Sequence, residues 1–252
     1  MLLMPLLYLL VDGFLHKGII RVLLPKNFNQ QVYLLEPNNK QHLYSSDKFW
    51  IKAVNTPEAL QKIDLNASGC EIDVYFDTLA NTFFLHHDDN NNNKFSIDSF
   101  LSIYKNQYRS HCLWLDFKNL NSANQESSLK KLTSLRTEYK LYNKIIVESR
   151  FANLLNIFAD NNFYTSYYTP YSLVYFNTNG QNKQYIDSVA LQIKTNKISA
   201  LSGYYFQQPI LQHSFPNYPI LQWQANDNYS VINWLYNKKV NQNRNILVTL
   251  LP

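Results

Sequence analysis

Short apolar segments with the character of β-strands alternate with helical segments from residue 49 to the end of the chain. This alternation is typical of parallel α/β folds, in which each helix returns the chain to the starting end of the next strand. Eight strands with helices between them over about 200 residues predict an α/β domain folded as a single (β/α)8 TIM barrel. The predicted strands are Phe49–Val54, Gly69–Phe76, Cys112–Phe117, Lys144–Ser149, Phe163–Tyr168, Val189–Leu191 (within Tyr185–Ile193), Pro219–Trp223 and Ile246–Leu250.

Local signals place a hairpin arm and several helices between these strands. Thr82–His87 is the predicted hairpin arm after the second strand. Thr56 is the predicted N-cap of the first helix, with Pro57 at its first helical position. Apolar residues at helical spacing predict further helices over Ser96–Tyr108, Ser127–Tyr139, Ala152–Asp160 and Tyr229–Asn237.

Two of the predicted strands carry charged residues two positions apart. Glu71 and Asp73 lie in one strand, and Asp116 and Lys118 lie at the end of the next. Because side chains alternate between the two faces of a strand, each pair shares a face. A buried, unpaired carboxylate is costly, so these acids need a cationic partner. The pattern predicts a metal or phosphate site at the mouth of the barrel.

The N-terminal segment, residues 1–24, is apolar in its first half and interrupted by charged and polar side chains in its second. Met1–Val11 is strongly apolar, whereas Asp12, His16, Lys17 and Arg21 break the apolar character of the second half. Two interpretations stay open: a signal or membrane anchor, and a short hydrophobic element docked on the domain. Residues 25–48 form a polar lead-in, and residues 49–252 form the barrel domain. The apolar start favours a cell-envelope or secreted location over a cytoplasmic one.

Charge and cysteine content exclude some partners and say little about the redox compartment. The 23 Lys and Arg exceed the 18 Asp and Glu to give a net charge of +5. These basic residues are scattered, so no nucleic-acid partner is expected. Cys70 points away from the face of Glu71, whereas Cys112 shares the face of Asp116, so no disulfide between them is expected. Both cysteines are predicted to be small core residues.

The order of the acidic motifs resembles that of the phospholipase-C-like phosphodiesterase superfamily, which includes the glycerophosphodiester phosphodiesterases. The motifs that carry this resemblance are Glu71-Ile72-Asp73, His87-Asp88 and Asp116-Phe117-Lys118. Further segments resemble the menorin family and its bacterial relatives, and the similarity extends from Phe49 to the C-terminus. These segments are Ala53-Val54-Asn55, Leu115–Leu120, Val147-Glu148-Ser149, Tyr164–Tyr168 and Leu221-Gln222-Trp223.

The resemblance implies a metal-dependent phosphodiesterase, a phosphoric diester hydrolase acting on a small-molecule or lipid-head-group phosphodiester. Glu71, Asp73 and Asp116 would hold a divalent cation, Mg²⁺ or Ca²⁺, through hard oxygen ligands. Lys118 would anchor the phosphate as a point charge, and His87 would transfer protons.

The position of the catalytic histidine in the hairpin leaves two readings of the motif. A gapless count from Glu71 lands on His86, whereas one extra hairpin residue lands on His87. Asp88 follows His87, as in the His-Asp motif of the family, and therefore favours His87.

The family's first catalytic histidine falls at Lys52 in this chain. Neighbouring carboxylates would keep this lysine charged, which leaves two hypotheses. Lys52 could bind the substrate phosphate while His87 alone handles protons. Alternatively, its ammonium could occupy the cation position in a catalytically degenerate binding protein. Glu148 and Trp223, at predicted strand ends, are candidates for substrate binding.

Overall fold

The computed structural model describes residues 3–24, 28–45, 47–64, 67–87, 95–107, 111–171, 179–224 and 229–251. The strands are β1 (Phe49–Ile51), β2 (Gly69–Asp77), β3 (Thr82–Leu85), β4 (Cys112–Phe117), β5 (Ile145–Ser149), β6 (Tyr164–Tyr168), β7 (Ala200–Tyr204), β8 (Ile220–Trp223) and β9 (Ile246–Leu251). The helices are α1 (Leu3–Leu15), α2 (Lys17–Leu23), α3 (Pro57–Gln61), α4 (Ile97–Gln107), α5 (Gln125–Glu138), the 3-10 helix η1 (Ala152–Leu155), α6 (Asn156–Asp160), α7 (Asn179–Thr195), α8 (Gln208–Ser214) and α9 (Val231–Gln242).

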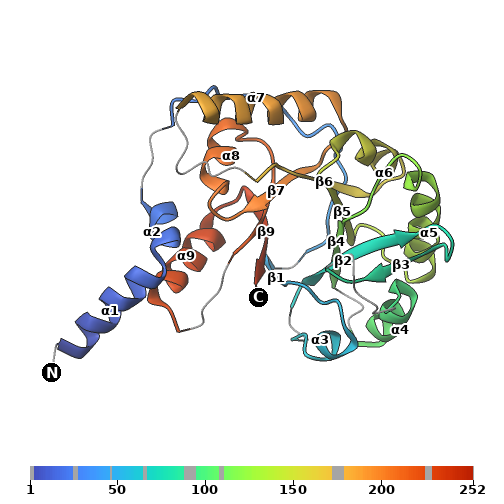
Figure 1. Cartoon of the computed structure of the whole chain (residues 1–252), viewed down its shortest axis with the longest axis horizontal. Coiled ribbons are helices and arrows are strands. Elements are labelled where there is room, and N and C mark those ends of the chain that lie inside the picture. The colour runs from blue at the N-terminus through green and yellow to red at the C-terminus, as the bar shows by residue number, and fades with distance from the viewer. Residues whose placement is uncertain are drawn as a thin grey trace.

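The strands close into a parallel barrel surrounded by helices, which confirms the predicted fold (Figure 1). Neighbours follow the order β1-β9-β8-β7-β6-β5-β4-β2, and β1 also pairs with β2 through Ile51 and Cys70. Strand β3 lies outside this ring, because it pairs antiparallel with the end of β2 as the predicted hairpin arm. All eight barrel strands therefore end on the same side, where a barrel carries its functional site.

One predicted strand is wrong. The segment at Val189–Leu191 belongs to α7, and the strand at this place in the barrel is β7. The buried residues of α7 recur at helical spacing over the whole helix, but the short apolar run at Val189–Leu191 taken alone looks the same as a buried strand. Strand β7 gives a weak strand signal, because it contains Ser202 and Gly203. The buried side chains of α7 are Asn182, Tyr185, Ile186, Val189, Ala190 and Ile193.

The start of α3 has the predicted cap. Thr56 Oγ1 accepts a hydrogen bond from the backbone N–H of Ala59 at 3.1 Å, and Pro57 occupies the first turn.

We expect Thr56→Ala to lower the free energy of unfolding by about 1 kcal/mol, because it leaves a helix N–H without its partner. Urea unfolding followed by circular dichroism measures this loss. Thr56→Ser keeps the hydroxyl and serves as the control. An equal loss in both variants would contradict a capping role.

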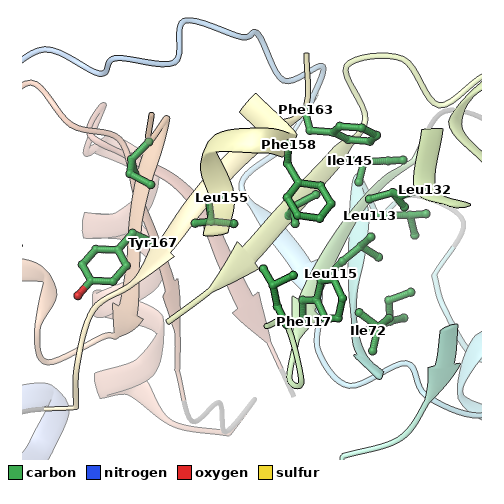
Figure 2. Close-up of a cluster of buried hydrophobic side chains, with 14 of the residues drawn as sticks. Ile72, Leu113, Leu115, Phe117, Leu132, Ile145, Leu155, Phe158, Phe163 and Tyr167 are labelled. Carbon is green, nitrogen blue, oxygen red and sulfur yellow. The ribbon is translucent and has the colours of Figure 1, made fainter. Parts of the chain in front are cut away.

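The core has two layers that follow the alternation of strand side chains. One layer lies between strands and helices and includes Phe117, Phe158 and Phe163 (Figure 2). The other fills the barrel interior, with Trp50 and Trp114 among its largest side chains. Cys70 belongs to the outer layer and Cys112 to the inner one. Both are free, as predicted, and burial raises the pKa of the Cys112 thiol to about 12.

The N-terminal segment forms two helices. Ile19 and Val22 of α2 are buried against Tyr236 and Val240 of α9. Helix α1 extends away from the barrel beside α9 (Figure 1). Among the helices in the described part of the chain, none combines the length and the apolar character needed to cross a membrane.

Candidate functional site

Three carboxylates meet inside the barrel at the end where its strands finish. Asp73 of β2 lies directly opposite Asp116 of β4 in the parallel register, and Glu71 precedes Asp73 on the same face. All three are buried, and one oxygen of each lies within 4.8 Å of the others. The structure thus brings together the three residues predicted as metal ligands.

A lysine ammonium lies against two of these carboxylates. Lys118 Nζ is 2.7 Å from Asp73 Oδ1 and forms a second ion pair with Asp116 Oδ2. Burial alone would lower the pKa of Lys118, but Asp116 and Asp73 outweigh it and raise that pKa. Lys118 is therefore charged, and it contacts the acids from beside the end of β4.

The turn after β1 supports the acidic cluster with hydrogen bonds. The backbone N–H of Ala53 donates to Glu71 Oε2 at 2.6 Å, and Ala53 has a φ of 56°, in the left-handed region. Asn55 Nδ2 donates to Asp73 Oδ2 at 2.5 Å, while Asn55 Oδ1 accepts from the Asp73 N–H at 2.8 Å. Asn55 was not among the predicted site residues, although the Ala53-Val54-Asn55 run was a signal for it.

The cluster has the chemistry of a cation site. Burial, followed by repulsion from Asp73 and Asp116, raises the pKa of Glu71 well above its usual value. Burial likewise raises the pKa of Asp116, against the opposing effect of Lys118. A divalent ion would relieve this repulsion, and carboxylate oxygens are the ligands that Mg²⁺ and Ca²⁺ prefer. The residues present therefore fit such an ion.

Glu148 lies beside this cluster in the barrel interior. It is opposite Asp116 in the register of β4 and β5, and it is fully buried. Neither carboxyl oxygen makes a well-formed hydrogen bond in the described part of the chain, and the nearby Ser202 hydroxyl only partly opposes the rise in the Glu148 pKa. Burial, with a further contribution from Asp116, raises its pKa well above the usual value.

This raised pKa predicts how Glu148 affects stability as a function of pH. Above the ordinary glutamate pKa of 4.5, the unfolded state loses its proton while the folded state retains it. Rising pH therefore favours unfolding through this group. We expect Glu148→Gln to be more stable than the wild type at neutral pH in chelator, with the difference shrinking toward pH 4.5. Urea unfolding across this range measures it.

The exposed Glu126→Gln variant is the matched control, and its difference from the wild type should not follow the same trend. A Glu148→Gln curve parallel to the wild type from pH 4.5 to neutral would contradict the expectation.

The two hairpin histidines lie differently. The His86 ring stacks on Tyr75 with centroids 4.1 Å apart, and its backbone N–H donates to the Asp73 carbonyl at 3.2 Å. The His87 side chain is exposed, and it is one of the groups that oppose the rise in the pKa of Asp116, so it lies within electrostatic reach of the cluster. Asp88 lies outside the described residues.

Lys52 and Trp223 lie at the ends of β1 and β8. Lys52 follows β1 directly, with its N–H bonded to the Leu251 carbonyl and its side chain exposed. Trp223 ends β8 and packs against Trp114, Tyr168 and Tyr204, with ring centroids 5.0 to 5.6 Å apart. Of these four rings, Trp223 was the predicted substrate-binding residue, and the other three come from β4, β6 and β7.

Comparison with known proteins places this fold. No protein-family model matches the chain, and no curated protein does. A glycerophosphodiester phosphodiesterase from Parabacteroides distasonis superposes with a TM-score of 0.58 at 12% identity, over 82% of this chain and 93% of that one. The barrel has the glycerophosphodiester phosphodiesterase fold. The menorin-like relationship stays a prediction.

A second solved structure of this fold carries a ligand. It is a phosphodiesterase from Oleispira antarctica in complex with its product sn-glycerol-3-phosphate. It superposes with a TM-score of 0.51 at 12% identity, over 81% of this chain and 92% of that one. At 12% identity, the similarity to these phosphodiesterase structures establishes the fold of this chain.

Proposed function

We propose that the chain is a divalent-cation-dependent phosphodiesterase, a phosphoric diester hydrolase acting at the carboxyl end of the barrel. The observation that carries this proposal is the buried cluster of Glu71, Asp73 and Asp116, whose oxygens lie within 4.8 Å of one another. It sits at the functional end of a fold shared with glycerophosphodiester phosphodiesterases.

The chain's residues have separable roles in this proposal. Glu71, Asp73 and Asp116 would hold the cation, which when bound supplies positive charge to polarise a phosphate oxygen. Lys118 would bind the phosphate as a fixed positive charge, and Asn55 would hold Asp73 in place. The exposed His87 is the candidate for proton transfer at the attacking or leaving oxygen.

The substrate class follows from the position of the site and from the fold. A small-molecule or lipid-head-group phosphodiester suits a site at the barrel mouth. The Oleispira antarctica phosphodiesterase holds sn-glycerol-3-phosphate as its product, which supports a glycerol-type phosphodiester. Lys52, exposed after β1, and Trp223, at the end of β8, would contact the rest of the substrate. Glu148 would support the bound substrate from inside the barrel.

A second candidate is a binding protein with a degenerate active site. The Lys52 ammonium was predicted at the cation position in this alternative, but the Lys52 side chain is exposed. The ammonium that pairs with Asp73 and Asp116 is that of Lys118, and this pairing is the observation that favours the second candidate. Lys52 stands in for the first catalytic histidine in both candidates. The two differ in one measurable property, because only the enzyme requires a divalent cation at the carboxylates.

Calorimetric titration of Mg²⁺, Ca²⁺ and Mn²⁺ tests the cation site. We expect the wild type to bind at least one of them, and Asp73→Asn to weaken that binding at least about 100-fold by removing a charged ligand. Asp160→Asn changes an exposed carboxylate of a surface ion pair and should bind like the wild type.

Hydrolysis of glycerophosphodiesters should be seen in the proteins that bind the cation, the wild type and Asp160→Asn, and should be lost in Asp73→Asn. A wild type that binds none of the three ions, and cleaves no phosphodiester, would leave the binding protein as the conclusion.

A further inference from the structure

Helix α1 exposes apolar side chains around its whole circumference. Asp12 is the one charged residue between Met4 and Leu15, and it is 4% exposed. Consecutive α-helical residues are turned by about 100°, so the run from Leu6 to Val11 points in every direction. The exposed apolar residues, each 47% to 80% accessible, are Met4, Leu6, Leu7, Tyr8, Leu9, Leu10, Val11, Phe14 and Leu15. We call these nine residues the apolar arm.

Helix α1 is attached to the barrel by polar contacts, and its apolar side chains stay exposed rather than packed against the barrel. Asp12 accepts a hydrogen bond from the Ile232 N–H at 3.1 Å and pairs with His16 at 2.9 Å. The Tyr8 hydroxyl donates to the Tyr229 carbonyl. The rest of the helix extends away from the barrel (Figure 1). The attachment therefore holds the arm at Tyr8 and Asp12, and it leaves the arm's apolar side chains exposed.

The arm's geometry favours lipid over a second copy of the chain. A partner helix would cover one stripe of α1 and leave the others in water. Acyl chains would surround all of its faces. The helix has 13 residues, or about 20 Å at 1.5 Å per residue, against about 30 Å for a bilayer's hydrocarbon core. Such a helix reaches into one leaflet.

Cationic and aromatic side chains lie where the arm joins the barrel. Lys17 Nζ is 5.7 Å from the centroid of the Phe14 ring, and Lys238 Nζ is 5.5 Å from that of Trp234 on α9. Trp234 is 60% exposed, and Leu235 beside it is 41% exposed. Tryptophan and lysine are typical of the head-group region, where lysine attracts anionic lipids.

We propose that the apolar arm inserts into one leaflet of an anionic phospholipid bilayer, with Trp234 and Lys238 of α9 at the head groups. Helix α9 follows β8, so this attachment lies near the end of the barrel that carries the acidic cluster. Bilayer attachment does not depend on the proposed catalytic function, and it can be measured without any substrate.

Co-sedimentation with vesicles of phosphatidylcholine and phosphatidylglycerol in equal parts tests the insertion. We expect the full chain to bind, and Leu6→Gln/Leu7→Gln/Leu10→Gln to partition at least about 100-fold more weakly. The matched control, Leu34→Gln/Leu79→Gln/Leu191→Gln, replaces three exposed leucines elsewhere on the chain and should bind like the wild type. Lys17→Gln/Lys238→Gln should weaken binding about tenfold or more, and only on vesicles that contain phosphatidylglycerol.

Quenching by brominated lipids tests the orientation. Trp50 and Trp114 are fully buried and Trp223 is 8% exposed, so quenching on vesicles should arise from Trp234 and disappear in Trp234→Phe.

Three results would overturn the proposal. The first is a wild type that does not bind vesicles, and the second is equal binding by the two triple-leucine variants. The third is a wild type that forms a dimer in solution and does not bind vesicles, where the arm variant is monomeric and the control variant is not. The last result would identify a second copy of the chain as the cover of the arm.

Discussion

Lys118→Met is expected to lower the free energy of unfolding by about 3–5 kcal/mol in chelator at neutral pH, because it leaves buried carboxylates without their positive partner. Lys118 contacts Asp73 and Asp116, which are 3% and 11% exposed as side chains. Burial and mutual repulsion already raise the pKa of Asp116, and losing Lys118 would raise it further. The loss should therefore grow as the pH rises and more of the acid ionises in the unfolded state.

The same variant separates the two candidate functions. If the cluster binds a divalent cation, adding it at about 100 times its dissociation constant should restore roughly 2.7 kcal/mol. Urea unfolding with and without Mg²⁺ or Ca²⁺ measures this rescue. Lys131→Met breaks the more exposed Lys131–Asp98 pair and should change stability by no more than about 1 kcal/mol. Equal losses in the two variants would show that Lys118 does not neutralise a buried cluster.

Phe158→Ala is the second substitution with a large expected effect, a loss of about 3–5 kcal/mol. Phe158 of α6 is fully buried, and it meets Phe117 and Phe163 edge to face with ring centroids 6.4 Å and 6.2 Å apart (Figure 2). Truncation would open a cavity among aromatic rings that tie α6 to β4 and to the start of β6. A loss of this size is a large part of the stability of a typical domain.

Thermal and urea unfolding of Phe158→Ala measure this cost, with Phe158→Leu expected to lose less because it fills more of the space. Phe151→Ala, at a ring that is 41% exposed, is the control and should cost less than about 1 kcal/mol. Similar losses at Phe151 and Phe158 would mean that the aromatic cluster does not hold the helix against the barrel.

Most barrel strands could be predicted because their signals are local. The alternation within Cys112–Phe117 and the cap at Thr56 depend on residues a few positions apart, and both are confirmed. Strand β7 could not be found in this way. Its serine and glycine are tolerated because neighbouring strands pair with it on both sides. The apolar run in α7 has the composition of a strand, although it is helical.

The sequence by itself determined that Glu71 and Asp73 share one face of their strand, because strand alternation is a property of the local backbone. That Asp116 faces the same barrel interior follows from the pairing of β2 with β4. Only the tertiary structure decided what these acids meet. The chain leaves β1 through a left-handed residue at Ala53, which leaves Lys52 exposed and aims Asn55 at Asp73. Lys118 contacts Asp73 because β2 and β4 are neighbours in the closed barrel, a long-range pairing that no local pattern encodes.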